Sequence, residues 1–286
     1  MKKAVIFDLD GLLIDSEVIS HRLYDELLHR YGKSVTVAEY ARDYSGKTGV
    51  ANMTNVIARY NLPITVEEGL TWEVAREKEL LQDVQLKPAA ALLSWLKTEG
   101  VAVVLATSSV RERAVEVLTR LGVVQYFDDM VFGTEIERGK PWPDIFLKAA
   151  EKAHAAPADC LVLEDSEAGI QAAHAAGIDV LCVPDMKMPA ESYQQMTAAM
   201  LKSLDEVKGW LSGSMASIDP YAVGADSISA RARLPYPQTR PVYNPLRACT
   251  YCAHGGVFMS YLDCAQYDCC HNKAGCCCLD GINVRH

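Results

Sequence analysis

The stretch AVIFDLDG, residues 4–11, places four apolar residues directly before two aspartates, Asp8 and Asp10. An apolar run of this kind is typical of a strand buried on both faces of a parallel sheet. Side chains two apart in a strand point to the same side, so the pattern predicts two carboxylates close together. Because such carboxylates repel, they need a partner, and their hard oxygen ligands favour Mg²⁺.

Strand-like and helix-like segments alternate along most of the chain. Apolar runs predict further strands at VAVVLATSS (101–109), MVFG (130–133), CLVLED (160–165) and IDVLCVP (178–184). Strands that alternate with helices predict an α/β fold, here a Rossmann-like, doubly wound parallel sheet with right-handed crossovers. Ligands of such sheets bind at the carboxyl ends of the strands.

The segment between the first two predicted strands is mostly helical and too long for an ordinary crossover. We therefore expect residues 16–83 to form an inserted α-helical cap, with a core domain made of residues 1–15 and 84–211. Within the cap, TVEE at residues 65–68 fits a capping box that begins a helix.

The composition changes in the last quarter of the chain. RLPYPQTRPVYNP, residues 233–245, is rich in proline and predicts an extended linker. Eight of the ten cysteines follow it, between residues 249 and 278. Residues 212–286 therefore read as a Pro-rich linker and an irregular Cys-rich tail, either a natural domain or a fused, non-native extension.

The cysteines of the tail leave two alternatives open. Cys249 and Cys252 form a CxxC pair of the kind that binds Zn²⁺, but the CC and CCC runs after it lack the usual ligand spacing. The other alternative is an unfolded appendage with too few regularly spaced apolar residues to make a core. The sequence names no partner for the tail.

Composition also limits partners and location. The net charge of −9 argues against a nucleic-acid-binding surface. Only four apolar residues follow Lys3 before Asp8, too few for the apolar region of a signal peptide, and no stretch approaches the roughly 18 apolar residues of a membrane span. We expect a cytoplasmic protein with neither a nucleic-acid nor a membrane partner.

A second acidic pair, Glu164 and Asp165, ends the predicted strand CLVLED. Four carboxylates at one edge of a sheet would repel one another, so the two pairs together predict a Mg²⁺ site. The alternative is that one pair simply favours the start of the following helix, where acidic residues are stabilising.

Hydroxyl and ammonium groups are expected at the same edge. Thr107 and Ser108 offer hydroxyl and N–H groups where a helix begins, which suits an anion, although an ordinary helix cap has the same appearance. Lys140, in the loop GKPWPDIF, could screen phosphate charge and a nucleophilic carboxylate. In the cap loop YSGKTGVA, Gly46 and Lys47 could contact the substrate, or Lys47 could be an ordinary solvated lysine.

In order along the chain, DLDG, ATSS, GKPWPDIF and LEDSEAGIQAAHAAG resemble the four motifs of the haloacid dehalogenase (HAD) superfamily. The closest resemblance, over residues 1–211, is to the branch of β-phosphoglucomutases and phosphatases with an α-helical cap. It implies a Mg²⁺-dependent phosphatase that hydrolyses a small phosphomonoester, such as a sugar phosphate or nucleoside monophosphate, through an aspartyl phosphate.

The resemblance also implies roles for the residues at the predicted sheet edge. Asp8 would be the nucleophile and Asp10 the general acid and base. The phosphoryl group would be held by Thr107, Ser108 and Lys140. The Mg²⁺ ligands would all be oxygens, from the Asp8 carboxylate, the Asp10 carbonyl group, Glu164 and Asp165.

Two alternatives to a phosphatase remain. β-Phosphoglucomutases carry a histidine four residues after the hydroxyl residue of the first cap helix, and an arginine after a glycine in the cap loop. Here the hydroxyl residue is Ser16, the position four residues on is Ser20, and Gly49 takes the place of the arginine, so hydrolysis is favoured. From a different class, the tail could be a metal-binding or interaction module that the enzyme only carries.

Overall fold

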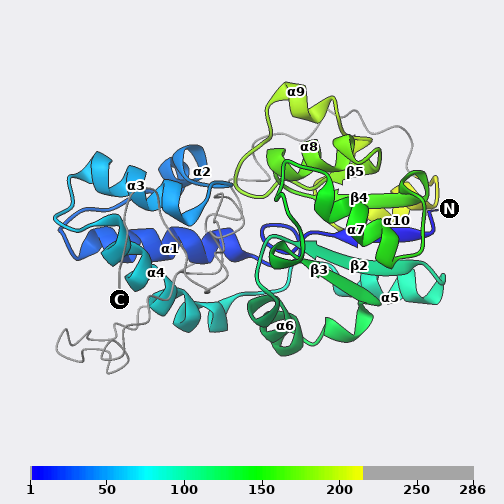
Figure 1. Cartoon of the computed structure of the whole chain (residues 1–286), viewed down its shortest axis with the longest axis horizontal. Coiled ribbons are helices and arrows are strands. Elements are labelled where there is room, and N and C mark those ends of the chain that lie inside the picture. Colours follow the sequence, from blue (N-terminus) through cyan, green and yellow to red (C-terminus); the bar gives the residue numbers. More distant parts are fainter. Residues whose placement is uncertain (1, 215–286) are drawn as a thin grey trace, which may run out of the picture.

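The computed structural model describes residues 2–214, in which a parallel sheet carries helices on both faces (Figure 1). The sheet has six strands in the order β3-β2-β1-β4-β5-β6. These are β1 (Ala4–Phe7), β2 (Ala102–Thr107), β3 (Asp129–Phe132), β4 (Cys160–Glu164), β5 (Asp179–Cys182) and β6 (Ala199–Met200). The predicted α/β fold is confirmed, and the two-residue β6 is the one strand of this sheet that the sequence did not predict.

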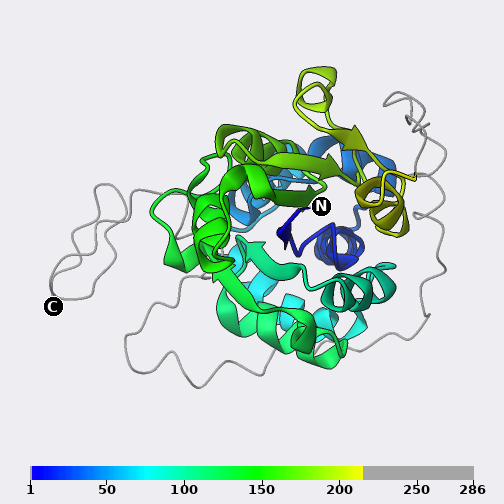
Figure 2. The ribbon, with the colours of Figure 1, turned by 90° about the vertical axis from the view of Figure 1, so that its right-hand side faces the viewer.

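Successive side chains of the central strands enter two different cores. In β1, Val5 and Phe7 join one buried cluster, while Ala4 and Ile6 join the other. The first cluster includes residues of α5 (Ala90–Thr98), α6 (Arg111–Arg120) and α10 (Asp205–Leu211). The second includes residues of α7 (Asp144–Lys152) and α8 (Glu167–Ala175). Figure 2 shows β1, in blue, in the interior of the molecule with helices around it, as expected for a strand buried on both faces.

The insertion between β1 and β2 is helical, as predicted. It contains α1 (Ser16–His29), α2 (Val37–Asp43), α3 (Gly49–Tyr60) and α4 (Val66–Leu80), which lie to one side of the sheet in Figure 1. The expected capping box is present, because the Thr65 side chain accepts from the Glu68 backbone N–H and the Glu68 side chain accepts from that of Thr65.

The insertion has a hydrophobic cluster of its own, made of Tyr24, Leu27, Leu28, Val35, Tyr40, Tyr44, Met53, Val56 and Leu62. A separate core is what allows a segment to behave as a domain. We therefore propose residues 16–83 as a cap domain on a core of residues 1–15 and 84–211.

The two segments that join the insertion to the sheet run together. Ile14 forms isolated β-bridges with both Asp10 and Leu86, and the backbone N–H of Lys87 donates to the Leu13 carbonyl at 2.8 Å. Movement of the insertion relative to the sheet therefore has to pass through this paired linker.

Short elements complete the described chain: α9 (Glu191–Gln194) and the 3₁₀ turns η1 (Leu81–Asp83), η2 (Val124–Tyr126), η3 (Gly133–Glu135) and η4 (Pro157–Asp159). Cys160 and Cys182 are buried free thiols. No helix within residues 2–214 combines the length and apolar character needed to span a membrane. The predictions for the linker, the Cys-rich tail and its Zn²⁺ site fall outside this range.

Candidate active site

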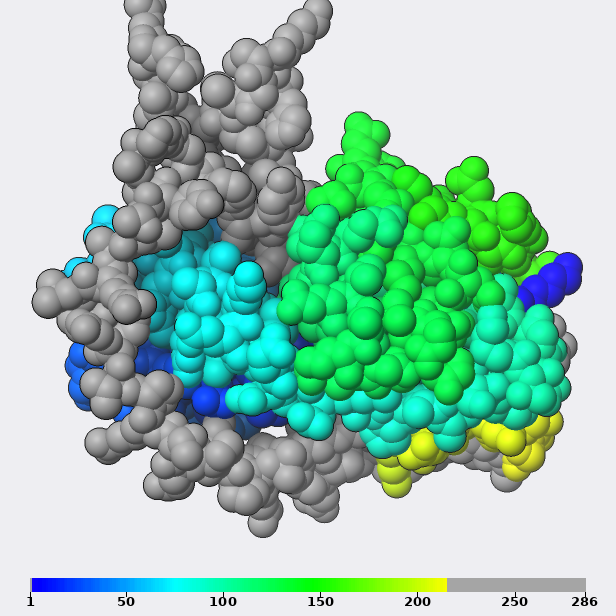
Figure 3. All heavy atoms as spheres, turned by 90° about the horizontal axis from the view of Figure 1, so that it is seen from below, coloured from blue at the N-terminus to red at the C-terminus, as the bar shows by residue number. Residues whose placement is uncertain are grey.

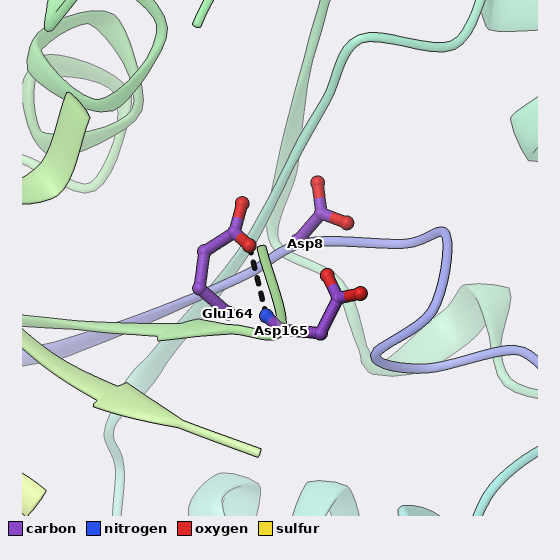
Figure 4. A group of neighbouring side chains, drawn as sticks. All are labelled: Asp8, Glu164 and Asp165. Atoms are coloured by element: carbon purple, nitrogen blue, oxygen red, sulfur yellow. Dashed lines mark hydrogen bonds between the residues drawn. The ribbon is translucent and has the colours of Figure 1, made fainter. Parts of the chain in front are cut away.

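Two neighbouring strands end in acidic residues where the strand order of the sheet reverses. From β1 the chain proceeds to β2 and β3 on one side, and β4 then pairs with β1 on the other side. Asp8 follows β1, Glu164 ends β4, and Asp165 comes next. One ligand oxygen from each of the three carboxylates lies within 4.8 Å of the others (Figure 4). This is the position at which open α/β sheets bind their ligands.

Lys140 is hydrogen-bonded to two of these carboxylates. Its Nζ atom donates to Asp8 Oδ1 at 2.5 Å and to Glu164 Oε1 at 2.6 Å. Its side chain is only 8% exposed. Burial lowers the pKa of Lys140, but the Asp8 and Glu164 carboxylates outweigh it and hold that pKa above its usual value. Lys140 is thus a fixed ammonium beside the proposed nucleophile.

One cation does not balance three carboxylates, of which Asp8 and Glu164 are buried and Asp165 is half-buried. Burial raises the pKa of Asp8 to about 7, with Lys140 opposing this rise and Glu164 adding to it. Burial, followed by the charges of Glu164 and Asp8, raises the pKa of Asp165 well above its usual range. A divalent cation would replace this repulsion with attraction, and oxygen donors of this kind are those that Mg²⁺ prefers. The donor set therefore fits Mg²⁺.

Glu164 is held rigidly within the group. Its Oε2 atom accepts hydrogen bonds from the Asp165 N–H at 2.8 Å and from both the N–H and the hydroxyl of Ser166 at 2.9 Å. A Cβ on Gly169 would lie 1.8 Å from Glu164 Oε1, so the first turn of α8 must carry glycine here. Oε2 accepts from these three donors, whereas Oε1 accepts from Lys140, so Oε1 is the Glu164 oxygen that could also contact a metal cation.

Neither residue of the second acidic pair is the N-cap of the following helix. The N-cap of α8 is Ser166, whose hydroxyl accepts from the Gly169 N–H at 3.1 Å. Glu164 supports this turn from within β4, and Asp165 lies in the carboxylate group.

Asp10 is bonded to a cation of its own. Its Oδ1 accepts from Arg113 Nη2 at 2.9 Å, and its Oδ2 accepts from Arg113 Nη1 at 3.0 Å and from Ser109 Oγ at 2.7 Å. Burial raises the pKa of Asp10, but Arg113 more than offsets this and the pKa lies below its usual value. β1 ends at Phe7, so Asp8 and Asp10 follow the strand rather than belong to it. The Asp10 charge adds to the rise of the Asp8 pKa, and Arg113 balances the Asp10 carboxylate.

Thr107 and Ser108 lie at the carboxyl end of β2, next to β1 in the sheet. Thr107 is buried and its Oγ1 accepts from the Ser109 N–H at 3.0 Å, whereas Ser108 is exposed. The ordinary helix-cap alternative is wrong for both, because the N-cap of α6 is Val110 and makes no side-chain cap bond.

Gly46 and Lys47 line a pocket of about 310 Å³ together with Asp165 and Asp185. The pocket joins the cap loop to the segments that follow β4 and β5. Lys47 Nζ donates to the Asp43 carbonyl at 2.6 Å, so its ammonium already has a partner in the insertion. The structure therefore places both predicted cap residues at the same pocket as an acidic residue of the core.

Three charged residues around this site were not predicted from the sequence: Lys87, Arg113 and Asp185. Asp185 follows the end of β5 after Val183 and Pro184, so its position near a strand end was a usable signal. Arg113 lies four residues after Ser109, a spacing that brings side chains together once a helix forms. Lys87 gave no local signal, because its partners, Gly11 and Asp185, are distant in sequence.

Residues 5–183 match the family of haloacid dehalogenase-like hydrolases. The chain is similar to the phosphorylated carbohydrates phosphatase of Thermotoga maritima, with 34% identity over 188 residues that cover 62% of this chain and 82% of the relative. It is also similar to the bifunctional riboflavin kinase/FMN phosphatase of Arabidopsis thaliana, with 31% identity over 82% of this chain. The chain spans 64% of that relative's length.

The fold is similar to that of solved structures as well. A HAD family hydrolase from Deinococcus radiodurans R1, with bound phosphate and sodium, matches with a TM-score of 0.65 and 25% identity over 74% of this chain and 96% of that one. The chain belongs to the haloacid dehalogenase-like hydrolases, in the branch of β-phosphoglucomutases and phosphatases, and is a phosphoric monoester hydrolase of that family.

Proposed function

We propose that this phosphatase is Mg²⁺-dependent and hydrolyses a small phosphomonoester, a sugar phosphate or nucleoside monophosphate, through an aspartyl phosphate on Asp8. The observation that carries the proposal is the group of Asp8, Glu164 and Asp165 with Lys140 bonded to two of the three carboxylates. The similarity to a phosphorylated carbohydrates phosphatase supports the choice of substrate class.

Asp8 is the nucleophile of the proposed reaction. Lys140 holds its Oδ1, which leaves the other oxygen to attack phosphorus. Bound at Asp8, the Asp10 carbonyl oxygen, Glu164 and Asp165, Mg²⁺ would lower the repulsion between the anionic nucleophile and the anionic phosphate. As the Asp8–phosphorus bond forms, the ester bond to the leaving oxygen breaks.

Asp10 moves the protons. The negative charge of the bound phosphate raises the Asp10 pKa that Arg113 holds low in the free protein, so the carboxyl group carries a proton for the first step. It gives this proton to the leaving oxygen, which departs as an alcohol. In the second step the carboxylate takes a proton from water as that water attacks phosphorus, and the bond to Asp8 breaks. Inorganic phosphate leaves, and Asp8 and Asp10 return to their starting states.

Other groups at the sheet edge hold the phosphoryl group during both steps. In this proposal the Thr107 hydroxyl and the Ser108 N–H donate to phosphate oxygens, and Lys140 balances charge that develops on them. Their place at the ends of adjacent strands β1 and β2 supports this assignment.

The rest of the substrate would enter the pocket of about 310 Å³ beside Gly46 and Lys47. This volume lies at the lower end of ligand sites, about 300–1,000 Å³, and suits a small polar molecule. Lys47 and the backbone of Gly46 would contact its hydroxyl groups or a second anionic group.

The test is release of inorganic phosphate from a panel of sugar phosphates and nucleoside monophosphates, with and without Mg²⁺. Wild type is compared with Asp8→Asn and with Asp179→Asn, which changes an exposed aspartate at the start of β5. Mg²⁺-dependent release that is lost only in Asp8→Asn supports the proposal. A folded protein that releases phosphate from no ester overturns it, and transfer of phosphate to another sugar hydroxyl would show the mutase reaction instead.

A further inference from the structure

A continuous set of ionic contacts connects the helical insertion with Asp10. Glu77 of α4 accepts from Arg113 Nε at 3.2 Å, and the guanidinium of the same Arg113 binds both oxygens of the Asp10 carboxylate. We propose that Arg113 is a positioning residue that sets the orientation of the Asp10 carboxylate, and that Glu77 couples this orientation to the position of the cap. The inference rests on the proposed role of Asp10 in proton transfer.

The contact between Arg113 and Asp10 defines one geometry. Two parallel N–H···O bonds, at 2.9 and 3.0 Å, hold the carboxylate in the plane of the guanidinium. The Arg113 side chain is 12% exposed, so little water competes for these bonds. A carboxylate held by a single flexible contact could rotate, whereas this one rotates only if the guanidinium moves with it.

Ser109 closes a ring with these two residues. Its hydroxyl donates to Asp10 Oδ2 at 2.7 Å and accepts from Arg113 Nη1 at 2.8 Å. The Ser109 N–H is itself held by Thr107 Oγ1 at the end of β2. The ring therefore ties the proposed acid–base group to the part of the site that would hold phosphate.

Glu77 brings the insertion into this network. It lies on α4, while Arg113 lies on α6 of the core, and the cyan surface of the insertion borders the green surface of the core in Figure 3. A second contact between the same regions comes from Arg120, whose Nη2 donates at 2.9 Å to the carbonyl oxygen of Leu81 in the insertion. The same atom donates to the carbonyl oxygen of Val84, directly after the insertion, at 2.9 Å. A shift of α4 relative to α6 would alter the Glu77–Arg113 contact, and through this contact the proposal couples the cap to the guanidinium.

The chemistry of the leaving group separates a positioning role from a purely structural one. A sugar alkoxide is strongly basic and must receive a proton from Asp10 as the ester bond breaks. A p-nitrophenolate is weakly basic and leaves as the anion, without that proton. Misplacing the Asp10 carboxyl group should therefore slow formation of the aspartyl phosphate from a sugar phosphate much more than from p-nitrophenyl phosphate.

The experiment measures single-turnover phosphorylation of the full chain in Mg²⁺, with the best sugar phosphate of the panel and with p-nitrophenyl phosphate. Arg113→Met is expected to lower the sugar phosphate rate about 10- to 100-fold and the p-nitrophenyl phosphate rate by less than about 3-fold. Arg113→Lys keeps the positive charge without the bidentate contact. The ratio of its sugar phosphate rate to its p-nitrophenyl phosphate rate should lie between those of wild type and Arg113→Met. Arg111→Met is the matched control, because Arg111 lies on the same helix with a side chain 58% exposed and an ion pair to Glu135.

Glu77→Gln tests the coupling to the cap. Glu77→Gln weakens the contact to Arg113 but leaves the Arg113–Asp10 bonds. We therefore expect the rate with the sugar phosphate, divided by the rate with p-nitrophenyl phosphate, to fall by about 3- to 10-fold. An equal loss of both rates in Arg113→Met and Arg113→Lys would overturn the positioning role. An unchanged ratio in Glu77→Gln would overturn the coupling. A wild-type protein that turns over neither ester would count against the proposed function itself, which these variants do not test.

Discussion

Lys87 Nζ lies 2.6 Å from Asp185 Oδ1, and the two side chains are only 7% and 4% exposed. Lys87 also donates to the carbonyl oxygen of Gly11. Gly11 lies in the segment that leads from β1 into the insertion, and Lys87 lies in the segment that leads from the insertion back to the core. Asp185 lies after β5 of the core. One buried ion pair therefore fastens both linkers to the sheet.

Removal of Lys87 should strongly destabilise the protein. Lys87→Met leaves the Asp185 carboxylate buried without its cation, and Asp185 Oδ2 already has no hydrogen-bond partner in the described structure. We expect the free energy of unfolding, measured with urea, to fall by about 3–5 kcal/mol. Lys87→Met/Asp185→Leu removes both charges and should recover much of this loss. A single variant as stable as wild type would contradict the assignment.

Gly11 should be required for the metal site as well as for the backbone. Its φ is +76°, and a Cβ here would lie 2.2 Å from Asp165 Oδ2. Gly122 is the matched control, because its φ is +71° with nothing within 4 Å of a Cβ. We expect each alanine variant to lose about 1–2 kcal/mol of stability from backbone strain.

Only Gly11→Ala should also weaken Mg²⁺, by about tenfold, because it displaces Asp165. A calorimetric Mg²⁺ titration of both variants checks this. Equal Mg²⁺ affinities would show that the contact with Asp165 has no bearing on the metal.

Lys140 should be essential for catalysis. Lys140→Met removes the ammonium that is bonded to Asp8 and Glu164 and leaves the carboxylates to repel one another. We expect kcat for phosphate release to fall by about 10²- to 10³-fold. Lys148→Met, which changes a half-exposed lysine of α7 that pairs with Glu135, should stay near wild type. If Lys140→Met changed kcat only slightly, a group other than Lys140 would balance the charge of the phosphoryl group.

Glu17 should make stability depend on pH. Burial raises the pKa of this α1 carboxyl to about 7 from its ordinary 4.5, although hydrogen bonds from Tyr40 and Gly46 oppose the rise and the charge of Asp185 adds to it. Between pH 4.5 and 7 the folded protein holds a proton here that the unfolded chain has released. The free energy of unfolding should therefore fall as pH rises through this window, by up to about 3 kcal/mol from this group.

Comparison of Glu17→Gln with wild type isolates this contribution. The stabilities should converge near pH 4.5, and the variant should be the more stable above pH 7. Glu116→Gln, an exposed glutamate of α6, should follow the wild-type curve. Parallel curves for wild type and Glu17→Gln would place the Glu17 pKa near its ordinary value.

The segment after residue 214 should be dispensable for phosphate release. The match to the family ends at residue 183, and every site residue named above lies before residue 214. We expect a chain of residues 1–214 to release phosphate with the kcat and KM of the full chain. A substantial loss of activity would give the Cys-rich tail a part in catalysis.

The sequence by itself determined the core of the fold. Strands β1, β2, β4 and β5 are short apolar runs with helical patterns between them, a pattern that only a parallel sheet with two covered faces can bury. It also indicated Asp8, Glu164 and Asp165, because polar residues that directly follow such strands meet at one edge of the sheet. Local spacing was sufficient at these positions.

The tertiary structure alone decided how the charges pair. Lys140 was expected near the nucleophilic carboxylate only through the resemblance of the ordered motifs, and it is 132 residues from Asp8. Arg113, 103 residues from Asp10, and Lys87, 98 residues from Asp185, were not predicted at all. No local pattern encodes such contacts, since they exist only after crossovers bring distant loops to the same edge. Asp8 and Asp10 of AVIFDLDG indicated from the sequence where the site lies. The packing of separate elements around them determined that Lys140 pairs with Asp8 and Arg113 with Asp10.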